Sequence, residues 1–131
     1  MRYMGLVIMD PNQGPPPQAL MDAMEVYVGK NAADGIYLDG GGLGQGENRI
    51  GYQVRSGQMS TTDGPFTEGK EIIGGFAVLE YRNHAEAVEG ARSFTELHRE
   101  HWPEWEGRVE MHLIEGAEAT GCPVGEQEPG A

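Results

Sequence analysis

The sequence has a single cysteine, Cys122, and therefore no internal disulfide bond. Only nine lysine and arginine residues stand against 21 aspartate and glutamate residues, which gives a net charge of −12. Nucleic acid and anionic membrane surfaces are poor partners for so acidic a chain, because they carry charge of the same sign. No segment approaches the roughly 20 apolar residues that span a bilayer. These absences predict a cytoplasmic protein without nucleic-acid or membrane partners.

What the chain does contain is typical of one folded domain. Its 131 residues are 38% hydrophobic and 23% charged, which suits a soluble globular protein with a core of its own. The 21 glycines are about twice the usual share, so turns and close backbone contacts are expected. Residues 116–131 are rich in glycine, glutamate and proline. We therefore expect a domain over residues 1–115 and a C-terminal tail over residues 116–131.

Hydrophobic periodicity and breaker residues predict the order of the elements. In the first predicted helix, Leu20, Met24, Tyr27, Val28 and Asn31 follow helical spacing. Asn83, followed three residues later by Glu86, resembles the start of a second helix. We expect strands over residues 3–9, 36–38, 50–54, 58–62, 76–81 and 108–114, and helices over residues 18–34 and 83–102.

This order is strand-helix-strand, a β-hairpin insertion, and then strand-helix-strand. Two such halves, with both helices on one side of a mostly antiparallel sheet, predict an α+β sandwich of ferredoxin-like type. One face of the sheet would then be open. Small sheets with an open apolar face commonly pair with a second copy, so a homodimer is expected.

Residues 64–70 fit the first seven positions of a phosphate-binding loop, G-x-x-x-x-G-K. The eighth position must be serine or threonine to hold magnesium, and here it is Glu71. The loop also leads into a predicted strand rather than into a helix whose N-terminus would face the phosphates. The match is accidental, and the sequence predicts no nucleotide cofactor.

The same stretch carries a more specific pattern. Residues 62–66 read Thr-Asp-Gly-Pro-Phe, Lys70-Glu71 follows, and residues 74–76 read Gly-Gly-Phe. With the opening Met-Arg-Tyr-Met, this resembles the YCII-related, or DGPF-domain, family over roughly residues 1–115. The resemblance implies a ferredoxin-like fold that forms a dimeric α+β barrel. Some relatives accompany or are fused to alternative sigma factors, and others use a His–Asp pair for lyase-type chemistry on small molecules.

The candidate catalytic residues are Asp63, His98 and His101. The better-understood branch of the family carries its histidine on the first helix, but residues 18–34 contain none. On the second helix, His98 and His101 end the stripe that is expected to face the sheet. Two histidines at this spacing are too few ligands for a metal site, so no metal is predicted. The alternative is structural: Asp63 caps a turn, and the histidines bond to backbone near a helix end.

Two functions therefore remain open at the level of sequence. In the first, the protein binds or transforms a small organic molecule by lyase-like or isomerase-like acid–base chemistry in a pocket near Asp63. Asp63 is then the general base or orients a histidine, and His98 or His101 is the proton partner. In the second, the protein is a non-catalytic dimeric binding or regulatory module, such as a partner of a sigma factor. The two differ in whether Asp63 and the histidines face one cavity.

Overall fold

The elements of the computed structural model follow the predicted order. The structure describes residues 1–46, 48–63 and 71–116, without the side chains of Thr62 and Asp63. Within these residues the elements are β1 (Arg2–Met9), α1 (Gln18–Ala33), β2 (Tyr37–Gly42), β3 (Ile50–Arg55), β4 (Gln58–Asp63), β5 (Ile72–Glu80), α2 (His84–His101) and β6 (Gly107–Leu113).

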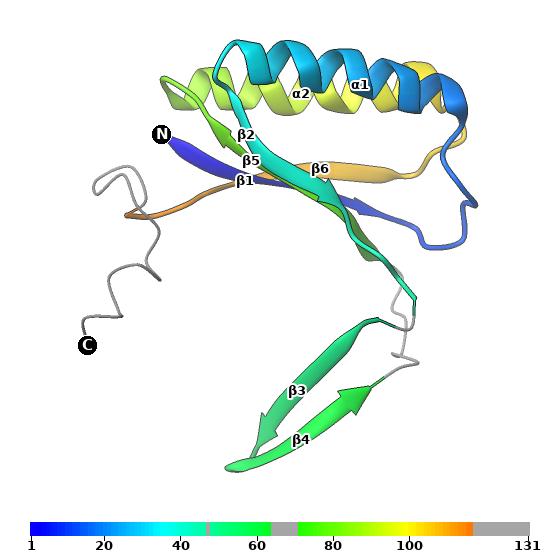
Figure 1. Cartoon of the computed structure of the whole chain (residues 1–131), viewed down its shortest axis with the longest axis vertical. Helices are drawn as coiled ribbons and strands as arrows, with labels where there is room; N and C mark the ends of the chain where they lie inside the picture. Colours follow the sequence, from blue (N-terminus) through cyan, green and yellow to red (C-terminus); the bar gives the residue numbers. More distant parts are fainter. Residues whose placement is uncertain (47, 64–70, 117–131) are drawn as a thin grey trace.

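A four-stranded sheet forms one layer and the two helices form the other. The strands lie in the order β2-β5-β1-β6, and each adjacent pair is antiparallel. Both helices cover the same face of the sheet, and the opposite face carries no helix of the described chain (Figure 1). This α+β arrangement is compatible with the ferredoxin-like fold that the order of elements predicts.

Strands β3 and β4 form a separate two-stranded antiparallel hairpin, which confirms the predicted insertion. The hairpin leaves the main sheet after β2, returns at β5, and projects away from the two layers (Figure 1). The phosphate-loop match lies on the return, in residues 64–70, outside the described part of the chain. The DGPF motif lies there too except for Asp63, whose backbone ends β4. Residues 117–131 of the expected tail, with Cys122, also lie outside it.

Two strands are longer than the sequence pattern predicts. Strand β2 continues through Gly42, although the glycines had indicated that it ends before them. Strand β5 begins at Ile72 rather than at residue 76. Main-chain hydrogen bonds hold both extensions, since Gly41 pairs with Phe76 and Gly42 pairs with Gly75. Glycines occupy residues 40–42 and 74–75, and a periodicity of side chains cannot reveal a strand at residues that have none.

Side chains between the layers form the core. Tyr3, Leu79, Tyr81 and Ala87 make one buried cluster where β1, β5 and α2 meet. Helix α2 begins as predicted, because the Asn83 side chain accepts a hydrogen bond from the Glu86 amide at 2.9 Å. The core thereby fixes the direction of α2, whose last turns lie over the sheet beside α1 (Figure 1).

Candidate functional site

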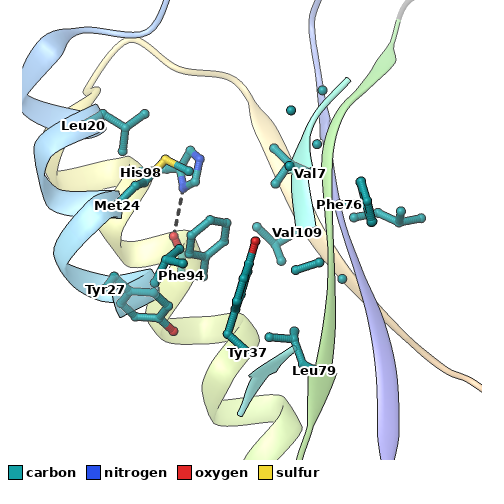
Figure 2. Close-up of a pocket in the computed structure, with 18 of the residues that line it drawn as sticks. Val7, Leu20, Met24, Tyr27, Tyr37, Phe76, Leu79, Phe94, His98 and Val109 are labelled. Carbon is teal, nitrogen blue, oxygen red and sulfur yellow. Dashed lines mark hydrogen bonds between the residues drawn. The ribbon is translucent and has the colours of Figure 1, made fainter. Parts of the chain in front are cut away.

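An apolar cavity lies between the helices and the sheet. Its volume is about 380 Å³, which is within the usual range for sites of small molecules. Helix α1 contributes the predicted inward stripe, including Leu20, Met24 and Tyr27, and α2 contributes Phe94 and His98 (Figure 2). The spacing of apolar residues in α1 therefore predicts which side chains of this helix form one wall of the cavity.

Glycines on the helix-facing side of β2 and β5 make room for the cavity. Gly42 lies opposite Gly75 in the strand register, and both residues line the cavity. Positions that are paired across antiparallel strands point to the same face of a sheet. Because neither residue has a side chain, the space above this part of the sheet stays unfilled. Phe76, the neighbour of Gly75, points away from the helices (Figure 2).

None of the described residues that line the cavity is Asp, Glu, Lys or Arg. Some of its polar side chains are already engaged with other protein groups. The Tyr27 hydroxyl lies 2.6 Å from the Ser93 hydroxyl, and the Asn31 amide donates to the Tyr27 carbonyl at 2.7 Å. The Tyr37 hydroxyl extends from β2 into the space between the layers, and no partner is found for it within the described chain (Figure 2). The cavity therefore has very few polar groups to offer a ligand.

His98 is the titratable group that is best placed for chemistry. Its side chain is only 4% exposed, and its ring lies against Phe94 and Trp105 with centroid distances of 4.8 and 4.5 Å. Its Nδ1 lies 2.9 Å from the Phe94 carbonyl oxygen, which can only accept, so Nδ1 carries the proton and donates (Figure 2). The neutral ring then has a free electron pair at Nε2, for which the described residues provide no partner.

Burial lowers the pKa of His98 below its ordinary value, and the hydrogen bond to the Phe94 carbonyl opposes this effect only in part. His98 is therefore neutral at physiological pH. In this form Nε2 accepts a hydrogen bond or a proton, as a general base must.

The lowered pKa predicts a loss of stability in mild acid. The unfolded chain binds a proton at His98 near pH 6.5, whereas the folded chain does so only at lower pH. The free energy of unfolding should therefore fall as the pH drops below about 6.5, with a slope of at most about 1.4 kcal/mol per pH unit from this group. Urea denaturation at pH 7.5, 6.5 and 5.5 measures the effect. His98→Phe should flatten the profile in this window, and an unchanged slope in that variant would contradict the assignment.

The other two predicted site residues are His101 and Asp63. His101 lies in the last turn of α2, its side chain is 33% exposed, and Nε2 lies 3.7 Å from a Glu100 carboxylate oxygen. It is not among the described residues that line the cavity. The Asp63 backbone pairs with Ile50 at the base of the hairpin, and its side chain lies outside the described atoms. Of the two histidines, the structure brings His98 to the cavity, and the role of Asp63 stays a prediction.

Sequence reasoning missed the parts of the site that have no chemical signature. Tyr37 was expected in a short strand, the glycines of β2 were expected to follow that strand, and neither Tyr37 nor Trp105 had an assigned site role. No three His, Cys, Asp or Glu side chains within it are grouped to hold a metal ion. None of its helices is long and apolar enough to cross a membrane.

The fold and the cavity define an α+β domain, compatible with the ferredoxin-like fold, with an apolar chamber between its layers and a buried histidine in the chamber wall. The chain belongs to the YCII-related domain family, whose profile matches residues 1–100. The match confirms the family indicated by the motif of residues 62–76. No curated protein matches the sequence.

Proposed function

We propose that the protein binds a small organic molecule in the helix–sheet cavity and that His98 exchanges a proton with it. The observation that carries this proposal is the neutral His98 ring, buried in a chamber of apolar side chains with Nε2 unpaired in the described chain. An unpaired ring nitrogen in an apolar chamber gains a hydrogen bond only when a ligand or water bonds to it. Acid–base chemistry of the lyase or isomerase kind needs such a group within hydrogen-bond reach of the substrate.

Asp63 is part of this proposal as the carboxylate that completes the site. Its support is topological: Asp63 ends β4, and the chain then returns to β5 at Ile72, two residues before the glycines of the cavity wall. Loops placed by a rigid sheet are where functional side chains concentrate. His101 follows His98 by one turn and is partly exposed, so it is suited to pass the proton on to solvent.

The test begins with a thermal-shift screen of small metabolites against the purified protein. Once a substrate is found, Asp63→Asn should leave the melting temperature nearly unchanged and reduce turnover by about 10²-fold or more. His98→Phe should remove turnover and weaken binding as well. Normal turnover in Asp63→Asn would eliminate the carboxylate from the mechanism.

A second candidate function is binding without turnover, as a ligand sensor or regulatory module. The observation that favours it is the lack of any charged side chain among the described residues around the cavity. In that case the screen finds a ligand that shifts the melting temperature, but no chemical change of the ligand follows. Product analysis by mass spectrometry after prolonged incubation separates the two functions.

A homodimer is the quaternary structure that we propose. The sheet face opposite the helices has apolar side chains at its centre, including Met4, Leu6 and Val78, with Phe76 directed to the same side (Figure 2). The hairpin adds a second apolar surface, because Ile50, Tyr52, Val54 and Met59 are each 64–72% exposed. Contiguous apolar surfaces of this kind are rare on monomers and mark interfaces.

Light scattering should give a mass of about twice 14.2 kDa at micromolar concentration. Leu6→Glu should produce monomers, because it places a charge at the centre of the open face. The matched control is Val26→Glu on α1, where the native side chain is already 75% exposed, and it should stay dimeric. A stable wild-type monomer would contradict the proposed dimer.

A further inference from the structure

We infer that the ligand of the helix–sheet cavity is an uncharged, largely apolar molecule that carries a hydroxyl group, and that this hydroxyl donates a hydrogen bond to Nε2 of His98. The inference rests on the proposed function, because it assigns a chemical class to the ligand of the same cavity. It follows from the charge, the polarity and the size of the chamber.

The charge of the ligand is limited by the wall. Because no Lys or Arg is among the described lining residues, a carboxylate or phosphate would lose its hydration without gaining a counter-ion. Because no Asp or Glu is among them either, the same holds for an amine. The net charge of −12 on the whole chain further disfavours the approach of anions. A neutral ligand is the one kind that this wall accommodates without an uncompensated charge.

The polarity of the ligand is limited by the tautomer of His98. Since Nδ1–H is used by the Phe94 carbonyl, Nε2 offers an acceptor and no donor. A ligand must therefore bring the hydrogen, and a hydroxyl group does so while staying uncharged. The Tyr37 hydroxyl lies on the opposite wall and can donate to a ligand oxygen in turn (Figure 2). Trp105 in the same wall holds a buried Nε1–H that has no partner among the described residues. Apart from these groups, the wall is largely apolar and favours hydrocarbon.

The size of the cavity sets the scale of the hydrocarbon part. An apolar cavity of about 150 Å³ holds one benzene ring, and this chamber is about 380 Å³. Two fused rings, or a saturated skeleton of similar volume, therefore fit with some space to spare. Methionines in the wall, including Met24 and Met111, adapt their flexible side chains to the shape of the ligand.

The experiment compares three ligands of nearly equal shape by isothermal titration calorimetry at pH 7.5. They are 2-naphthol, 2-methylnaphthalene, which lacks the donor, and 2-naphthoate, which carries a charge. We expect 2-naphthol to bind about fivefold to tenfold more tightly than 2-methylnaphthalene, as one hydrogen bond to a buried acceptor provides. We expect 2-naphthoate to bind more weakly than both.

Two histidine variants locate the effect. His98→Phe should reduce the affinity for 2-naphthol to that for 2-methylnaphthalene and leave the latter nearly unchanged. His112→Phe on β6, whose native side chain is 57% exposed and is not among the described cavity-lining residues, should bind all three ligands like the wild type. Equal affinities of 2-naphthol and 2-methylnaphthalene, or preferential binding of 2-naphthoate, would overturn the assigned class while the cavity remains a binding site. Absence of binding by all three would overturn the proposed function itself.

Discussion

Gly42→Leu should reduce the affinity of the cavity for an apolar ligand by about fiftyfold. The added side chain enters the chamber, because Gly42 faces Gly75 across the strands and both line the cavity. It displaces roughly three ligand carbons, each of which contributes about 0.8 kcal/mol when buried, and this total corresponds to about fiftyfold in Kd. Folding should tolerate the change, because a Cβ at this position meets only the Gly74 carbonyl oxygen, at 3.8 Å.

The matched control for this variant is Gly41→Leu, one residue earlier on the same strand. Gly41 also borders the cavity, but it pairs with Phe76, whose side chain points away from the helices, so a side chain at Gly41 should point to the opposite face of the sheet (Figure 2). A Cβ at Gly41 has no atom within 4 Å. The control should bind ligand like the wild type. Calorimetry and thermal melting of both variants check the prediction. Equal affinity in the two variants would show that the ligand binds elsewhere.

Gly107→Ala should destabilise the fold by about 3 kcal/mol, the largest effect on stability that we expect from a single methyl group. A Cβ at this position would lie 2.6 Å from the Ile8 carbonyl oxygen and closer still to Cζ2 of Trp105. The first atom belongs to the backbone of β1, which cannot yield, and the second to a ring that packs on His98 with centroids 4.5 Å apart. The methyl group must therefore displace part of the cavity wall.

Urea denaturation measures this loss, and Gly29→Ala on α1 is the control. A Cβ at Gly29 has no atom within 4 Å, so alanine should stabilise the helix by up to about 1 kcal/mol. The emission of Trp105 should also change in Gly107→Ala, because the ring must move. A Gly107→Ala protein as stable as the wild type would contradict the tight packing of Trp105 between His98 and β6.

The fold was predictable because its elements depend on local patterns. Apolar runs and helical spacing are properties of neighbouring residues, and the capping of α2 by Asn83 needs only three residues of context. The glycine segments of β2 and β5 were not predictable, since their pairing depends on strands far away in the sequence. The cavity follows from these same segments, so its volume could not be derived before the register of Gly42 and Gly75 was known.

The candidate site was predictable in part, for a geometric reason. At about 100° per residue, His98 lies about 40° from Phe94 around the helix, so both face the sheet. His101 lies about 60° from His98 and in the last turn, which leaves its side chain 33% exposed. The inward stripe of α2 therefore predicted that His98 is buried, but it did not distinguish the buried His98 from the partly exposed His101. The role of Asp63 depends on residues 64–70 and stays a prediction.

Ligand binding in the helix–sheet cavity is measured most directly by the fluorescence of the two tryptophans of the chain. These are Trp102 and Trp105, and both line the cavity. Titration of the protein with 1-adamantanol, a transparent and uncharged alcohol, should change their emission along a saturable curve. If the ligand binds between the helices and the sheet, Gly42→Leu should strongly raise the Kd obtained from this curve. Gly41→Leu should leave the Kd unchanged. A linear, unsaturable response in the wild type, or equal curves in all three proteins, would contradict a binding site in the cavity.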